Sequence, residues 1–142
     1  MRFMVMVKAT KDSEAGVLPD EKMLADMGKY NEQLVKAGVM LAGEGLHASS
    51  KGARVRFSGN KRTVIYGPFP EIKELVAGFW LWQVKSKEEA IEWLQRAPFD
   101  ETEVEVRQVF EDEEFAPSDP TGELRKKEAE LRKTIESQRR RS

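Results

Sequence analysis

The first apolar segment of the chain is apolar on both of its sides. Phe3, Val5 and Val7 share one side of an extended segment, and Met4 and Met6 share the other. Because successive side chains of a strand point to opposite faces, such a segment needs cover on both sides. We therefore predict a central β-strand at the start of the chain.

Two later segments follow the period of an amphipathic α-helix. The first lies between Pro19, which suits a first helical turn, and Gly38, which favours a C-terminal stop. Its apolar residues, spaced by three and four, are Met23, Leu24, Met27, Tyr30, Leu34 and Val35. The second begins at Ser86, which forms a capping-box pattern with Glu89, and is interrupted at Pro98.

The remaining apolar segments predict strands. Strands are expected over residues 39–48, 54–58, 62–66, 78–84 and from Val104 onwards. Gly43 and Gly45 lie so close together that they predict a bulge or a close approach of another backbone. Gly59 and Asn60 tolerate a tight turn and therefore predict a hairpin between the second and third of these strands.

The predicted order is strand, helix, strand, hairpin, strand, helix, strand. This order consists of two split βαβ halves, and it predicts an α+β fold with a ferredoxin-like sheet and an inserted β-hairpin. We expect this domain to span residues 1–111. Residues 112–142 are then a charged C-terminal extension, expected to be partly helical.

The extension differs from the rest of the chain in its charge. Residues 99–119 hold nine acids and one arginine, whereas residues 120–142 hold eight bases and four acids. Leu124, Leu131 and Ile135 are the only large apolar residues of the basic part, too few for a long coiled coil. The extension is therefore expected to be frayed or docked, in cis on the acidic run Glu111–Glu114 or on a protein partner. The basic run Arg139–Arg141 resembles a nucleic-acid contact, but three bases at a terminus are commonly only solvated, so we do not expect a nucleic-acid partner.

Composition argues against several classes of chemistry. The chain has no cysteine and one histidine, so thiolate catalysis, iron–sulfur clusters and multi-imidazole metal sites are not expected, and we expect no cofactor. Its 24 basic and 25 acidic residues nearly cancel, which gives no general attraction to nucleic acid. The apolar start, about seven residues long, is too short for a signal or membrane segment. We therefore expect a cytoplasmic protein without a membrane partner.

A sheet that is apolar on both faces predicts an oligomer. Trp80 and Trp82 share one face of their strand, and Met4 and Met6 add to the apolar surface of the sheet. Monomers rarely leave large apolar patches bare, and each such side chain contributes about 1.5–3 kcal/mol when it is buried. We expect a sheet-against-sheet homodimer in which a second copy covers Met4, Met6 and the tryptophans. The alternative is that the hairpin or the extension covers the same face.

Two motifs identify a family resemblance over about residues 1–110. The segment Gly43-Glu44-Gly45-Leu46-His47 is followed by Gly67-Pro68-Phe69, Glu71, Lys73-Glu74 and Gly78-Phe79-Trp80. At this separation the two motifs resemble the YCII-related family, also called the DGPF domain proteins. The resemblance implies a dimeric α+β barrel, related in architecture to muconolactone isomerases and small monooxygenases. It also implies a ligand cleft, a His–Asp pair as the core of an active site, and an association of some members with sigma-factor-like proteins.

The chain departs from the family pattern at one position. Tyr66 stands where the Asp of the DGPF motif is expected. A tyrosine hydroxyl ordinarily stays protonated at neutral pH, so it can donate a hydrogen bond but cannot act as a resting carboxylate base. Tyr66 is therefore a candidate donor, and a His–Asp mechanism at this position is not supported.

His47 is the candidate proton carrier, because histidine is the residue type that ordinarily changes charge between pH 5 and 8. A lone histidine at a strand end is more often structural or simply exposed. Glu44 and Glu71 are the candidate carboxylates that would orient His47. Glu44 can cooperate with His47 only if a bulge redirects one of the two side chains, and Glu71 can equally serve as a surface or helix-cap residue.

Further residues are candidates for ligand contacts. Lys51 and Arg54 can bind an anion at the mouth of a cleft, although most hairpin charges only keep an edge soluble. Phe69 and Trp80 can line an apolar pocket, although aromatic residues at period two belong first of all to a core or an interface.

The sequence thus favours a small cytoplasmic homodimer that binds a small organic ligand in a cleft, with acid–base catalysis as an open question. The alternative is a noncatalytic regulatory or interaction module, whose charged extension binds a protein partner such as the transcription machinery. Metal-free monooxygenase chemistry is a third reading, supported by fold analogy alone.

Overall fold

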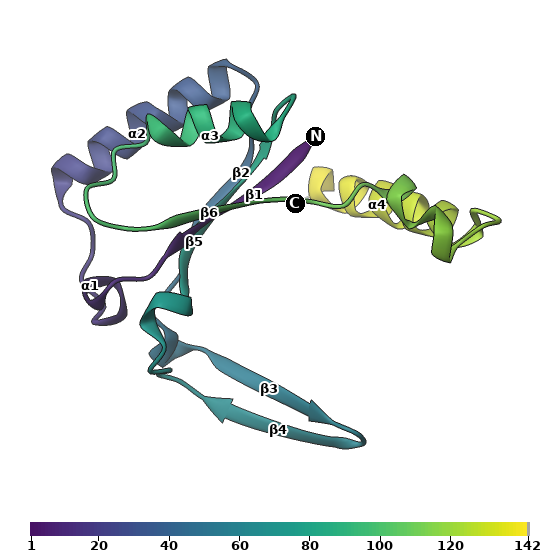
Figure 1. Ribbon diagram of the computed structural model, residues 1–142, viewed down its shortest axis with the longest axis horizontal. Helices are drawn as coiled ribbons and strands as arrows, with labels where there is room; N and C mark the ends of the chain where they lie inside the picture. The colour runs from purple at the N-terminus through teal and green to yellow at the C-terminus, as the bar shows by residue number, and fades with distance from the viewer. Residues whose placement is uncertain (142) are drawn as a thin grey trace. The chain divides into compact units, whose positions relative to one another are not determined.

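A computed structural model describes residues 1–141 of the chain (Figure 1). Its strands are β1 (Arg2–Lys8), β2 (Met40–Gly45), β3 (Ala53–Ser58), β4 (Lys61–Tyr66), β5 (Val76–Gln83) and β6 (Val104–Gln108). Its α-helices are α1 (Lys11–Glu14), α2 (Glu21–Lys36), α3 (Lys87–Gln95) and α4 (Glu123–Arg141). Short 3₁₀ turns are η1 (Ser49–Lys51), η2 (Ile72–Glu74) and η3 (Asp112–Ser118).

Four of the strands form one antiparallel sheet in the order β2-β5-β1-β6. This is the strand order of a ferredoxin-like sheet, with β1 and β5 at its centre, so the predicted α+β class is confirmed. β3 and β4 pair only with each other, as the predicted hairpin inserted between β2 and β5. In Figure 1, α2 and α3 lie over the same face of the four-stranded sheet.

Local capping explains where the helices begin. The Asp20 carboxylate accepts a hydrogen bond from the Met23 amide at 2.8 Å, so α2 starts two residues after Pro19. The Ser86 hydroxyl accepts from the Glu89 amide at 3.1 Å and begins α3 as expected. The Glu89 carboxylate accepts from the Lys85 amide at 2.7 Å, one residue before the Ser86 amide that the expected capping box requires. The short helix α1 was not predicted, although Thr10 and Ser13 form a reciprocal capping box at its start.

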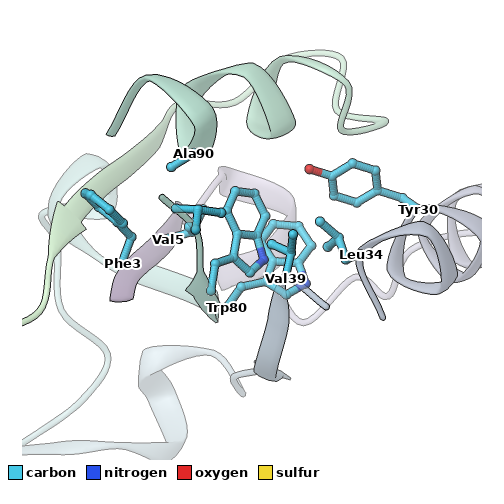
Figure 2. Packing of buried hydrophobic residues seen from close by; sticks show 9 residues of the cluster. Phe3, Val5, Tyr30, Leu34, Val39, Trp80 and Ala90 are labelled. Atoms are coloured by element: carbon cyan, nitrogen blue, oxygen red, sulfur yellow. The ribbon is translucent and has the colours of Figure 1, made fainter. Parts of the chain in front are cut away.

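The core lies between the sheet and the two helices (Figure 2). Trp82 is fully buried and Trp80 is 5% exposed, together with Phe3 from β1 and Leu34 from α2. The Tyr30 hydroxyl donates to the Trp93 carbonyl of α3 at 2.6 Å. Burial raises the pKa of Tyr30 to about 12, against a smaller opposing effect of a nearby arginine.

The opposite face of the sheet carries a different apolar set. Met4 pairs with Leu81 and Met6 pairs with Phe79, and all four side chains are partly buried. The expectation that a second copy must cover the tryptophans is therefore wrong, because both indoles pack beneath the chain's own helices. Period two placed Trp80 and Trp82 on one face, but it could not say which face the helices cover.

The glycines of β2 also differ from expectation. The register of β2 against β5 shifts between Met40 and Ala42 and is regular from Gly43 to Gly45, so the expected bulge at these glycines is wrong. A Cβ on Gly43 would lie 2.7 Å from Cδ1 of Trp80. Gly43 is thus required by the close approach of an indole side chain, and not by a bend of the strand.

The chain forms two compact units, Met1–Val109 and the segment from Phe110 onward. In the second unit, the Asp119 carboxylate accepts hydrogen bonds from the amides of Leu124 and Arg125 at the start of α4. Arg132 of α4 forms an ion pair with Asp112 at 3.2 Å, which places the acidic run against the helix as the cis alternative expected. Within residues 1–141, no helix combines the length and apolar character needed to cross a membrane.

Candidate functional site

Most of the sequence-predicted site residues lie at one end of the four-stranded sheet. Because the sheet is antiparallel, β1 and β2 end where β5 and β6 begin. His47 follows the end of β2, and Glu71 precedes the start of β5. The connections at this end are therefore the part of the fold that can bring the predicted residues together.

His47 lines a hollow of about 650 Å³ between the loop after α1 and the loop after β2. Lys51 and Glu14 line the same hollow, so the structure brings one imidazole, one ammonium group and one carboxylate to its wall. The apolar residues Val17 and Leu18 line it as well and are largely exposed, Leu18 by 84%. The hollow thus combines charged groups with an apolar wall, as small-molecule sites do.

Glu14 and Ser49 connect the two loops of this hollow. The Glu14 carboxylate accepts from the Ser49 amide at 3.0 Å through one oxygen and from the Ser49 hydroxyl through the other. The Ser49 Oγ in turn accepts from the Phe69 amide at 3.0 Å. Sequence reasoning missed both Glu14 and Ser49, because a hydrogen bond across 35 positions has no local signal.

The Gly67-Pro68 turn packs directly against the same loop. Its peptide bond is cis, and a Cβ on Gly67 would lie 1.7 Å from the carbonyl oxygen of Ser49. The Gly67 amide donates to the carbonyl of Gly52 at 3.0 Å. Only glycine fits this contact. The Gly67-Pro68-Phe69 motif therefore packs against the loop that bears His47 and helps to hold it in place.

Arg54, Phe69 and Glu71 form a separate group at the base of the hairpin. The Arg54 guanidinium lies 3.3 Å from the Glu71 carboxylate and 3.9 Å from the centre of the Phe69 ring. Both charged side chains are nearly half exposed. Glu71 lines a different hollow from His47, so its contacts support a role in holding Arg54.

The remaining predicted residues lie apart from His47. Tyr66 is 78% exposed and pairs with Ala53 across the hairpin. Trp80 and Glu44 line a smaller cleft of about 270 Å³, where the Trp80 indole donates to the Asn31 side-chain oxygen at 3.0 Å. Glu44 pairs with Phe79, so alternation along β2 directs its side chain to the other face of the sheet from Trp80.

The described residues contain no group of three or more His, Cys, Asp or Glu side chains placed to hold a metal ion. The ionisable side chains that line the His47 hollow are one imidazole, one ammonium and a carboxylate that is already hydrogen-bonded to Ser49. Such a set can hold an organic anion and transfer a proton.

Comparisons with known proteins identify the family. An uncharacterized protein from Rhizobium meliloti (strain 1021) is 31% identical over 74 residues, which span 52% of this chain and 60% of that protein. The solved structure of 5-chloro-2-hydroxyhydroquinone dehydrochlorinase (TftG) from Burkholderia phenoliruptrix AC1100, in complex with 2,5-dihydroxybenzoquinone, is 19% identical. It covers 80% of this chain and 98% of its own, with a TM-score of 0.40. Residues 1–113 match the YCII-related domain, and the chain therefore belongs to the YCII-related domain family.

Proposed function

We propose that this chain binds a small organic ligand in the hollow beside His47 and that His47 carries a proton to or from that ligand. The observation that supports this most is the shared wall of His47, Lys51 and the exposed apolar loop at Val17 and Leu18. An exposed apolar loop facing the only histidine of the chain gains stability when a ligand covers it.

The contacts support different proposed roles for the charged groups of the hollow. Lys51 is exposed and supplies a positive charge for an anionic group of the ligand. Both oxygens of Glu14 are hydrogen-bonded to Ser49, so Glu14 acts as a positioning residue for the loop that bears His47. His47 is then the group of the hollow to which we assign the proton transfer.

A single histidine makes this proposal easy to test by NMR. The chain gives one set of imidazole signals, which can be followed while a library of small organic acids is added. We expect ligands that bind the hollow to shift these signals, and Lys51→Gln to weaken those ligands. Glu92→Gln, on the exposed surface of α3, serves as the control for a change of one charge.

The proton-transfer role needs its own variant. His47→Gln keeps a polar side chain but cannot carry a proton at neutral pH, so we expect it to abolish turnover of any ligand that the wild-type chain converts. Undiminished turnover by His47→Gln would remove the assigned role. If the wild-type chain binds a ligand but does not convert it, the chain is a ligand-binding module and not an enzyme.

We also propose that the chain is a cytoplasmic homodimer. Met4, Met6, Phe79 and Leu81 form an apolar row on the sheet face opposite to α2 and α3. The hairpin adds an exposed apolar face of its own, from Val55, Phe57, Val64 and Tyr66. An isolated two-stranded hairpin is marginal in water, so a second copy packing against these surfaces accounts for both of them.

Native mass spectrometry tests the dimer directly. We expect the mass of two chains for the wild type and a shift toward one chain for Met6→Lys. Val35→Lys is the matched control, because Val35 is an exposed apolar residue on the outer side of α2. A single-chain mass for the wild type at high protein concentration would contradict the homodimer.

A second candidate function follows from α4. Leu124, Leu131 and Ile135 are more than half exposed on this helix, and their spacings of seven and four place them on one side. A noncatalytic interaction module would use this surface to bind a protein partner. If the chain is an interaction module, Leu131→Glu should abolish partner binding. If the chain is an enzyme, Leu131→Glu should change neither ligand binding at His47 nor turnover.

A further inference from the structure

The cleft lined by Trp80 and Asn31 adjoins the His47 hollow. Gly45 and Ala77 line both spaces, so the two meet at the end of β2 and the start of β5. The cleft, of about 270 Å³, is smaller than the pockets that typically hold drug-sized ligands. Its size suits a single ring. The larger His47 hollow then has room for the other end of the ligand.

Two glycines leave space at the base of this cleft, because they carry no side chains. Gly45 pairs with Gly78 of β5, and Gly78 pairs with Val7 of β1, so the two positions of this row on β2 and β5 carry no side chain. A Cβ on Gly45 would meet no atom within 4 Å, whereas the space above Gly43 is filled by the Trp80 indole. The free space therefore lies directly above Gly45, beside Trp80.

The walls of the cleft are aromatic. The centres of the Trp80 and Phe99 rings are 6.0 Å apart, with an angle of 63° between the ring planes. Outside the cleft lining, the Tyr30 ring packs edge-to-face against Trp80 at 5.8 Å. Met27 adds a thioether from α2. Rings prefer to pack edge-to-face or offset against other rings, and sulfur packs well against ring edges, so an aromatic ring is favoured here over a saturated one.

Asn31 provides the polar contact within the cleft. Its side-chain oxygen accepts the Trp80 indole N–H at 3.0 Å, which fixes the orientation of the amide group. The amide nitrogen is then the end of Asn31 that can donate to a ligand that enters. A ring that bears a hydrogen-bond acceptor satisfies this donor.

The charges of the lining residues determine which end of the ligand lies in the cleft and which lies in the hollow. Lys51 and His47 in the hollow attract an anionic group, whereas the described residues that line the cleft include no cationic side chain. We infer that the ligand is an aromatic carboxylate whose ring fills the cleft above Gly45, whose ring acceptor bonds to Asn31, and whose carboxylate lies beside Lys51 and His47. This inference rests on the proposed function of the His47 hollow and names its ligand class.

Three simple carboxylates test this by NMR titration of the full chain. Benzoate is expected to shift the Trp80 indole and His47 imidazole signals along one saturation curve, and acetate to shift the His47 signals alone. Cyclohexanecarboxylate, which has the same charge without an aromatic ring, is expected to bind about two- to tenfold more weakly than benzoate.

The outcomes separate the two proposals. Benzoate that shifts His47 without Trp80, or that binds no more tightly than cyclohexanecarboxylate, overturns the aromatic site and leaves the proposed hollow intact. Benzoate that shifts Trp80 without His47 overturns the joined site and also the ligand role of the hollow. No shift of either signal with any of the three carboxylates overturns both.

Filling the cleft provides a structural test. Gly45→Val places two methyl groups in the open space, and we expect it to weaken benzoate by about tenfold or more while acetate binding stays within about twofold. Gly28→Val is the matched control, since a Cβ on Gly28 also meets no atom within 4 Å but lies on α2 outside both spaces. Benzoate affinity that is unchanged in a folded Gly45→Val chain contradicts the site.

A second variant tests Asn31 independently of Gly45. Asn31→Asp keeps an oxygen to accept the Trp80 indole N–H but removes the amide donor. In the wild type, 4-methoxybenzoate is expected to bind more tightly than benzoate because its ether oxygen accepts from Asn31. That advantage should vanish in Asn31→Asp, and an advantage that persists would remove Asn31 from the site.

Discussion

The sheet unit and the C-terminal unit of this chain are stabilised by different means. The sheet unit buries large apolar side chains such as Trp82, Phe3 and Leu34 between strands and helices. In the described part of the C-terminal unit, the only buried residue is Asp119, a carboxylate that is 7% exposed. Stability that comes from burying apolar area is lost when a large side chain is truncated. Stability that comes from hydrogen bonds to a buried carboxylate depends on pH and salt as well. That difference makes the comparison testable.

The largest expected effect is the loss of an indole from the core. Trp82→Ala should lower the free energy of unfolding by about 3–5 kcal/mol, because a fully buried ring is replaced by a cavity. Leu131→Ala in α4, where the side chain is 56% exposed, should change it by no more than about 0.5 kcal/mol. All tryptophans lie in the sheet unit, so urea unfolding followed by far-ultraviolet circular dichroism, which reports the helices of both units, measures both effects, and equal effects would contradict the comparison.

Trp82→Phe refines this prediction. The Trp82 indole N–H is buried and has no hydrogen-bond partner among the residues that the structure describes. Phenylalanine removes this donor along with part of the ring volume, so the two effects partly offset. We expect Trp82→Phe to cost clearly less than Trp82→Ala.

The next effect concerns two glycines of the same strand. Gly43→Ala would place a methyl group 2.7 Å from the Trp80 ring, so the ring must shift, at a cost of about 1–3 kcal/mol. Gly45→Ala meets no atom within 4 Å and should be nearly neutral. Thermal unfolding of the two variants measures the difference, and similar melting temperatures would show that Trp80 relaxes freely.

The sequence predicted those features of the fold that have a local signal. The capping pattern at Ser86, the turn at Gly59 and the alternation in β1 lie within a few residues, and the structure confirms them. Which face of β5 the helices cover, and why Gly43 must be glycine, depend on contacts between distant segments. Helix packing decides both, and a single sequence does not display it.

The candidate site shows the same division. His47 and Lys51 were found because their chemistry is visible in the residue type, and the structure brings them to one hollow. Glu14, Ser49 and Asn31 were missed because their partners are 35 to 49 positions away. Asn31 in particular has no sequence signal, since it lies on the polar border of an otherwise ordinary amphipathic helix.

A smaller effect is expected from Asp119 in the C-terminal unit. The Arg125 amide, followed by its guanidinium and by the Leu124 amide, holds the pKa of Asp119 below its ordinary value, against an opposing effect of burial. Because the folded carboxyl has the lower pKa, its contribution to stability is complete above about pH 4 and is lost as pH falls through the lowered value.

The amide signals of Leu124 and Arg125 report this contribution directly. We expect both signals to move together at acid pH, and the start of α4 to lose helix content there. Asp119→Ala should produce the same loss at neutral pH, because it removes the acceptor of both amides. Amide shifts in Asp119→Ala that match those of the wild type would show that the carboxylate does not cap the helix.

The smallest effect is expected from the ion pair of Arg132 with Asp112. Its two side chains are 53% and 29% exposed, so the pair should contribute less than about 1 kcal/mol and should weaken as salt screens it. Hydrogen exchange of α4 should therefore be faster at high than at low salt, whereas Arg132→Gln should exchange at the faster rate under both conditions. The buried apolar contacts of β1 and β5 lack this dependence, so their amides serve as the internal reference. Exchange in α4 that ignores salt would mean that Asp119, and not the ion pair, holds the helix against the acidic run.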